Sequence, residues 1–106
     1  MMNPWAGEVA LVVDGVERRC RLTLGALAEM EAGLGDGGIL ALAGRIEEGR
    51  FTGGDVLAIV VAGLRGGGWE VTARDLLTAD IAGGPVAAAR AAAEMLARAF
   101  APPDPP

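Results

Sequence analysis

The residue types in this chain offer little with which to do chemistry. The sequence of 106 residues contains no histidine, and it also lacks serine, lysine and tyrosine. The usual general bases, hydroxyl nucleophiles, Schiff-base amines and nitrogen ligands are therefore missing together. The single cysteine, Cys20, has no histidine to activate it, and it falls on the apolar face of an expected strand, so we expect a buried structural thiol. We predict that the protein is not an enzyme and uses no cofactor.

Carboxylates are the remaining candidates for acid–base or metal chemistry. A hydrolase or a magnesium site would need two or three of them converging from different elements. Glu29 and Glu31 lie two residues apart on an expected helix, so they point to different sides. Asp14, Asp36 and Asp55 occupy expected turn or cap positions, where bonding to the local backbone explains them. We therefore expect solvated or capping carboxylates and no metal site.

The glycine-rich run GLRGGG (63–68) superficially resembles a phosphate-binding loop. The lysine and the serine or threonine that a P-loop needs at the start of its helix are absent. Helices expected on both sides also suggest a helix-turn-helix, but the second begins with TARD (72–75), which is poorly equipped to contact base edges. The net charge of −5 further disfavours a phosphate-binding surface. We interpret the run as a mobile joint and expect protein partners and no nucleic acid.

Length and composition predict a single domain, residues 1–106. One cysteine cannot form an internal disulfide, and no signal-peptide pattern opens the sequence, so we expect a cytoplasmic protein. The longest apolar run, Val56 to Ala62, is far shorter than the roughly 18 residues of a membrane span, so we expect no membrane association. The 17 glycines and the absence of lysine indicate a bacterial genome rich in G and C.

The stretch TGGDVLAIVVAGLR (52–65) organises the expected fold. As a helix it is apolar around its whole circumference, which predicts burial on all sides. Its β-branched residues would also permit a buried strand. The capping-box spacing of Thr52 and Asp55 and the glycines that follow favour the helix. We expect Val56 to Leu64 to be the most buried helical segment.

A hairpin and further helices are expected around this segment. Residues 8–22 alternate on either side of Asp14-Gly15, which predicts a hairpin with a type I′ turn and with Val16, Cys20 and Leu22 on its inner face. Thr23 is expected to cap a helix from Leu24 to about Gly33. Its expected inner stripe is Leu24, Leu27, Ala28 and Leu34.

Three other helices complete the expected α+β fold, a hairpin packed on a small bundle of four to five helices. One spans 39–48 and ends at Gly49, and a short one starts at Thr72 and ends near Asp80. The last begins at Pro85. The expected inner residues are Ile39, Leu42, Ala43 and Ile46 in the first, and Val86, Ala89, Ala93, Leu96 and Phe100 in the last. Residues 1–7 are expected to be a frayed lead-in, 23–100 the helical part, and 101–106 a disordered tail.

Two long stretches resemble the small tail protein family of bacterial gene transfer agents. They are RLTLGALAEMEAGLG (21–35) and LALAGRIEEGRFTGGDVLAIVVAGLRGGG (40–68), and the likeness continues through VTARDL (71–76) and the alanine-rich final helix. That family is grouped with phage tail assembly chaperones and is also described as tail-tube-like. The resemblance implies a non-enzymatic protein that acts in the producing bacterial cell on tape-measure and tail-tube proteins. It carries over no functional residue.

Two other functions stay open beside a tail assembly chaperone. One is a structural tail component that is retained in the particle, and the other is an unrelated small regulatory protein-interaction module. As the partner contact we select Trp69, with Leu64 and Leu76 beside it, because tryptophan is enriched at binding hot spots and three glycines precede this one. The alternative for Trp69 is that it caps the core beside Phe51.

Overall fold

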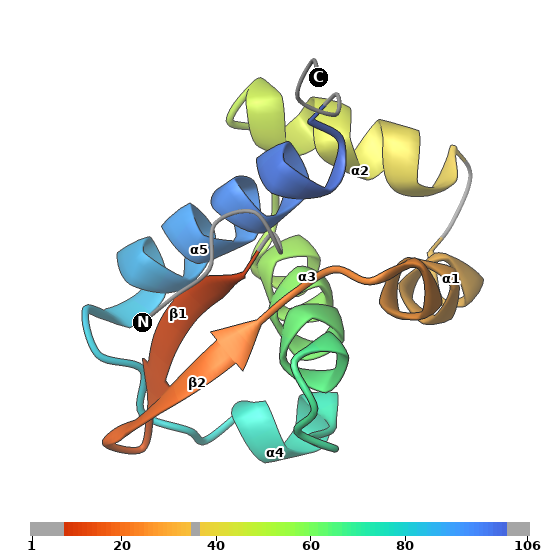
Figure 1. Cartoon of the computed structure of the whole chain (residues 1–106). Helices are drawn as coiled ribbons and strands as arrows, with labels where there is room; N and C mark the ends of the chain where they lie inside the picture. Colours follow the sequence, from red (N-terminus) through yellow and green to blue (C-terminus); the bar gives the residue numbers. More distant parts are fainter. Residues whose placement is uncertain (1–7, 35–36, 102–106) are drawn as a thin grey trace, which may run out of the picture.

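The computed structural model describes residues 8–34 and 37–101. These residues form one antiparallel hairpin followed by five helices, which confirms the expected α+β class (Figure 1). The expected lead-in (1–7), most of the expected tail (102–106) and Asp36 lie outside the described residues.

The hairpin consists of β1 (Val9–Val13) and β2 (Val16–Cys20). Asp14 and Gly15 between the strands have φ angles of 50° and 79°, so the expected type I′ turn is confirmed. The register places Val13 opposite Val16, yet Val13 is 1% exposed and Val16 is 49% exposed. The expectation that Val16 is buried was wrong because β2 is the open edge strand. The far edge of β1 is covered by the chain near Ile81, which forms a bridge to Val13.

The central element is α3 (Gly53–Gly66), which confirms the choice of helix over strand. Thr52 accepts a hydrogen bond from the backbone of Asp55, whose side chain accepts one from the backbone of Thr52, so the expected capping box is present. The chain that leaves β2 toward α1 crosses in front of α3 in Figure 1, and there the Arg21 N–H donates to the Gly63 carbonyl at 2.8 Å. The end of the strand and the helix therefore lie close together at this point.

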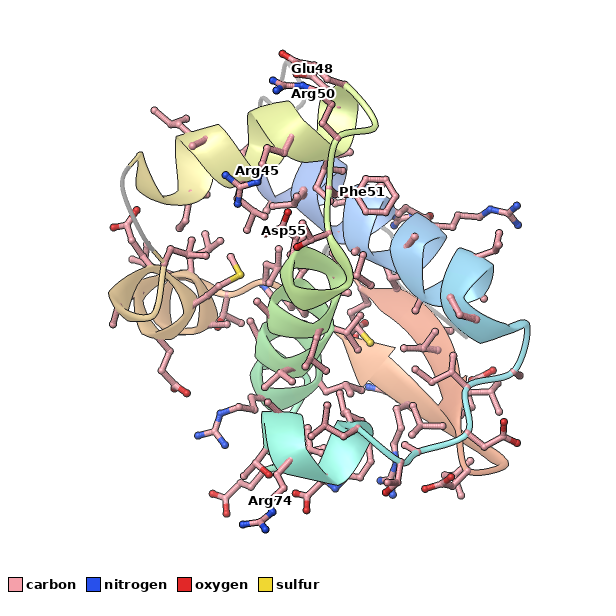
Figure 2. All side chains as sticks on the ribbon, turned by 180° about the vertical axis from the view of Figure 1, so that it is seen from behind. Arg45, Glu48, Arg50, Phe51, Asp55 and Arg74 are labelled. Atoms are coloured by element: carbon pink, nitrogen blue, oxygen red, sulfur yellow. The ribbon has the colours of Figure 1, made fainter. Side chains whose placement is uncertain are left out.

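The expectation that α3 is buried on all sides was wrong for one face. The fully or almost fully buried residues of α3 are Ile59, Val60, Ala62, Gly63 and Leu64. On the other side Leu57, Ala58 and Val61 are half-buried. The hairpin packs on one side of the helix only, and Figure 2, seen from behind, shows α3 in front of the hairpin. The helices that flank this second face leave it partly exposed.

The helix α1 (Leu24–Ala32) begins as expected, because the Thr23 hydroxyl accepts a hydrogen bond from the Ala26 N–H at 3.0 Å. Its expected inner stripe was wrong. Leu24 is 85% exposed and Ala28 is exposed, whereas Ala26 and Met30 are buried. Residues 26 and 30 are four apart and share the face toward α3, and Leu24, two positions before Ala26, points away from it. Leu27 and Leu34 are half-buried, in line with the expectation.

The long helix α5 (Gly84–Ala99) has Pro85 in its first turn, as expected. Val86 is 67% exposed, Phe100 is 50% exposed and Ala93 is exposed, so the expected stripe was wrong except at Leu96 and at the half-buried Ala89. The residues of α5 that face the core follow one helical stripe and are mostly small: Ala88, Ala91, Ala92, Met95 and Leu96. Alanine allows α5 to approach β1 and α3 closely.

The remaining helices are α2 (Gly38–Glu47) and α4 (Ala73–Leu76). On α2 the expected inner residue Leu42 is fully buried, and the expected stop at Gly49 has a φ of 72°. The other expected inner residues of α2 are half-buried: Ile39, Ala43 and Ile46. On α4 the capping box of Thr72 and Asp75 is present, but the helix ends well before Asp80. The Asp80 carbonyl accepts instead from the Asp14 N–H at 2.7 Å, so this part of the chain extends along β1.

Candidate protein-binding groove

The fold places the one cysteine, Cys20, in the core. Cys20 is fully buried, and this burial raises the pKa of its thiol to about 12, so it stays protonated and is a poor nucleophile. The burial agrees with the expected structural role. Among residues 8–34 and 37–101, no group of three or more cysteine, aspartate or glutamate side chains is placed to hold a metal ion.

The candidate carboxylates accept hydrogen bonds within the fold, several of them from residues distant in the sequence. Asp55 caps α3 and also accepts two hydrogen bonds from Arg45 of α2, at 3.0 and 2.9 Å (Figure 2). The bond from Arg45 is the main reason why the pKa of Asp55 lies below its usual value. Asp14 accepts from the Asp80 N–H at 2.8 Å. Glu29 and Glu31 point to different partners, Arg65 and the Ile39 N–H, and share no site.

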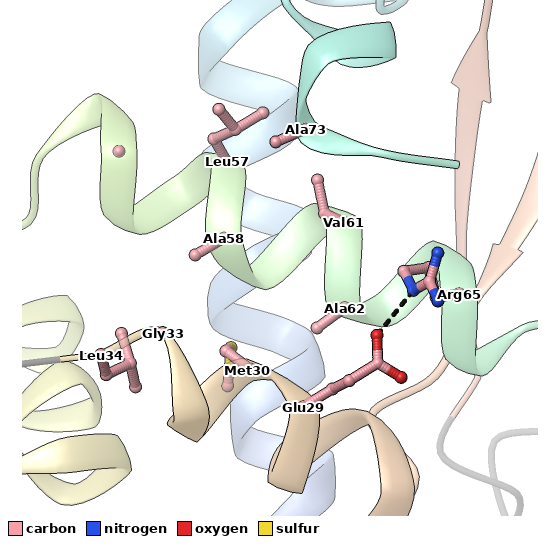
Figure 3. Close-up of a pocket in the computed structure, with 11 residues that line it drawn as sticks. Glu29, Met30, Gly33, Leu34, Leu57, Ala58, Val61, Ala62, Arg65 and Ala73 are labelled. Atoms are coloured by element: carbon pink, nitrogen blue, oxygen red, sulfur yellow. Dashed lines mark hydrogen bonds and ion pairs between the residues drawn. The ribbon is translucent and has the colours of Figure 1, made fainter. Parts of the chain in front are cut away.

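The half-buried face of α3 forms the floor of an apolar groove (Figure 3). The groove has a volume of about 320 Å³ and runs between α1 and α3, with the start of α4 on its other side. Small side chains or glycines at Gly33, Gly54 and Ala58 leave room in it. Its apolar walls come from two helices: Met30 and Leu34 from α1, and Leu57, Val61 and Ala62 from α3.

An ion pair crosses the groove at one end. Arg65 of α3 donates to Glu29 of α1 at 2.8 Å (Figure 3). It also donates to the Val71 carbonyl at 3.2 Å. On the far side of this pair lies a polar depression of about 250 Å³, whose lining includes Thr23 and Glu70 as well as Glu29 and Arg65. The two hollows therefore meet at the Glu29–Arg65 pair.

A second apolar depression lies on the other side of Leu57. It has a volume of about 260 Å³ and is lined by residues of α3, of α5 and of the chain around them, among them Phe51, Val56, Leu76, Ile81 and Pro85. Leu57 lines both hollows, so the uncovered surface extends across the amino-terminal half of α3.

The three residues selected from the sequence as a partner contact are placed differently from this groove. Leu64 is fully buried and Leu76 is 6% exposed, although Leu76 lines the second depression. Trp69 is half-buried, and the guanidinium of Arg18 lies 4.0 Å from the centre of its ring. Trp69 and Phe51 line different hollows.

Sequence reasoning missed Leu57, Ala58 and Val61 as surface residues. Their hydrophobicity was attributed to the core, because an all-round apolar helix is usually buried. The amount of apolar surface on this helix was the one feature of the sequence that could have identified them. A two-stranded hairpin and short helices rich in alanine cannot cover every side of it.

The fold is a hairpin packed on helices, with an apolar groove along its central helix. The family model described as "Phage tail tube protein, GTA-gp10" matches residues 6–102. The chain belongs to this family, and its role is therefore a structural or assembly role in a phage-like tail. No curated protein and no solved structure gave a significant match. Among the described helices, none has the length and apolar character required to cross a bilayer.

Proposed function

We propose that this protein is a tail assembly chaperone, which acts in the cytoplasm of the producing bacterium and binds an apolar segment of another tail protein. The observation that carries the proposal is the uncovered face of α3, with Leu57, Ala58 and Val61 on the floor of an open groove. Removing apolar surface from water is favourable by about 25 cal/mol per Å², so a partner that fills the groove gains free energy without new charged contacts.

The shape of the groove supports transient binding. The apolar residues on its floor, Leu57, Ala58 and Val61, are half-buried rather than exposed, so the free protein can stay in solution while the groove is empty. An occupant would cover a limited apolar area, and interfaces of limited area are typical of weak or short-lived complexes. An assembly factor needs such reversible contacts with tape-measure or tail-tube proteins.

A structural component of the tail is the second candidate, because the description of the family names the tail tube. In this case the uncovered face of α3 would be covered permanently by a neighbouring subunit in the particle. The two candidates differ in where the protein is found after assembly.

Quantitative mass spectrometry of producing cells separates the candidates. Particles are purified and compared with the lysate after removal of particles. The chaperone proposal predicts that the protein stays in the lysate, where an affinity tag recovers it with the tape-measure or tail-tube protein. Recovery of the protein in purified particles, at the stoichiometry of a tube subunit, would contradict the chaperone proposal and support the structural role.

Trp69 remains a proposed secondary contact. Its ring lies under Arg18 beside a polar depression of about 240 Å³, so only part of its surface is available to a partner. Trp69→Ala should keep a cooperative thermal transition and reduce recovery of the tail partner. A folded variant that recovers the partner at the wild-type level would remove Trp69 from the interface, together with Leu64 and Leu76, which were selected with it.

A further inference from the structure

We infer that the α1–α3 groove takes an amphipathic helix that carries lysine or arginine at the end of its apolar stripe next to Glu29 and Glu70. The inference rests on the proposed function, because it names the chemistry of the partner for the same groove. It depends on the length of the groove, on the small residues in its lining and on the unequal charge of its two ends.

The length and the lining of the groove fit a helix. Gly54 and Arg65 mark its ends along α3, and they are eleven positions apart, so the groove is about 16 Å long at the helical rise. Three turns of an occupant helix would fill it. The lining is largely apolar and offers few hydrogen-bond partners, which favours an occupant that satisfies its own backbone groups. Gly33 and Ala58 leave space for a side-chain ridge of this helix.

The two ends of the groove differ in charge. At the end near Gly54 the closest carboxylate, Asp55, is already bound by two hydrogen bonds from Arg45. At the other end two carboxylates, Glu29 and Glu70, line the polar depression together with one guanidinium, that of Arg65. Arg65 already donates to Glu29 and to the Val71 carbonyl, and Glu70 has no ion pair within the described residues. A cation on the occupant would find an acceptor here, and an anion would be repelled.

The Glu29–Arg65 pair does not prevent entry of such a helix. The side chain of Glu29 is 63% exposed and that of Arg65 is 37% exposed, and an ion pair as exposed as this contributes about 0 to 1 kcal/mol. Glu29 can therefore exchange Arg65 for a cation of the partner at little cost. A second copy of this chain is a poorer occupant, because it carries the same net charge of −5.

The test uses synthetic helical peptides of 16 residues. Each peptide has alanine as its background and leucines spaced three and four apart on one face, and it ends in either two lysines or two glutamates. Both placements of the charged pair, at the amino and at the carboxyl end, are made because the direction of the occupant is open. Binding to the full chain is measured by fluorescence anisotropy.

We expect the better lysine peptide to bind on the order of tenfold more tightly than its glutamate counterpart at low salt, and the ratio to shrink at 0.5 M salt. Glu29→Gln combined with Glu70→Gln should abolish the preference. The matched control, Glu47→Gln with Glu48→Gln on α2, removes the same charge away from the groove and should retain it. Val61→Asp should weaken both peptides.

Four results would overturn the inference. Equal binding of the lysine and glutamate peptides would remove the charge requirement. Loss of the preference in the α2 control would assign it to net charge alone. A wild-type dimer that Val61→Asp converts to a monomer would identify a second copy as the occupant. If none of the peptides binds while the tagged protein still recovers a tail protein from cells, the inference fails and the proposed function stands.

Discussion

At the scale of single residues, the buried Cys20 should make the stability of the fold depend on pH in the alkaline range, where few other groups titrate. Burial raises its pKa from 9.0 to about 12, and the sequence contains no lysine or tyrosine that would titrate in the same range. Above pH 9 the thiol ionises in the unfolded chain but not in the folded one. The unfolded state therefore binds fewer protons, and stability should fall by up to about 1.4 kcal/mol per pH unit until about pH 12.

Urea unfolding at pH 8 and pH 10.5 measures this effect. Cys20→Ala should fold at pH 8 with a modest loss of stability, because a small buried group is replaced by a smaller one. Between pH 8 and pH 10.5 the variant should also lose much less stability than the wild type does. Identical losses in both proteins would mean that Cys20 is not the buried titrating group.

Replacement of glycine by alanine is expected to have opposite effects on stability at two positions. A Cβ atom at Gly66 would overlap the backbone carbonyl of Arg21, whereas one at Gly44, within α2, would meet no atom nearby. Gly66→Ala should therefore destabilise the fold by about 1 to 3 kcal/mol or more. Gly44→Ala should stabilise it by about 0.5 to 1 kcal/mol. Thermal melts of both variants test the close approach of α3 to the end of β2. A melting temperature of Gly66→Ala equal to that of the wild type would contradict this close approach.

At the scale of elements, α3 has one buried face and one that lines the groove. Ile59→Asp would bury an unpaired carboxylate at a fully buried position and should unfold the domain. Val61→Asp places the same charge on the half-buried face and should leave a cooperative transition. Circular dichroism during heating distinguishes them. A native transition in Ile59→Asp, or its absence in Val61→Asp, would show that the two faces are wrongly assigned.

Within the described residues, the Arg45–Asp55 pair is the one hydrogen-bonded side-chain link between α2 and α3, and we expect it to help hold α2 in place. Arg45→Met should raise amide hydrogen exchange in residues 38–47 more than in α3. The pKa of Asp55 is lowered in the folded state, so its contribution to stability is present above its unfolded pKa and is lost as the pH falls below about 4. The variant should show a smaller loss of stability in acid, and an unchanged acid transition would contradict this role.

The sequence predicted the elements better than their inner faces. Caps and turns depend on neighbouring residues, so Thr23, Thr52 and Asp14-Gly15 identified the starts of helices and the turn correctly. The face of a helix that is buried depends on what packs against it. On α5 the large residue Val86 suggested an inner stripe, but the stripe that fits closely against β1 consists largely of alanines.

The groove could not be predicted for the same reason. Spacing within α3 reveals an apolar circumference, but only the positions of α1 and the hairpin decide that Val61 is left at the surface. Trp69 shows the same dependence on packing. Its type allowed either a partner contact or a cap on the core, and the fold places it half-buried under Arg18 of β2, a pairing between residues far apart in the sequence.

At the scale of the whole molecule, the hairpin packs on one side of the apolar helix α3, and another side of this helix is left partly exposed. Away from the hairpin, two apolar hollows, one toward α1 and one toward α5, share Leu57. A helix that is apolar all round but covered by its own chain on one side is suited to a protein that functions in a complex. Membership of a tail protein family supplies the setting for this complex.

The most direct test is recovery of tail proteins from producing cells by three tagged forms: the wild type, Val61→Asp and Leu40→Asp. Leu40 is 79% exposed on α2 and does not line the groove, so its variant controls for loss of an exposed apolar residue. The wild type and Leu40→Asp should recover the same tail protein, and folded Val61→Asp should lose most of it. Equal recovery by folded Val61→Asp would contradict the assignment of this groove as the binding site.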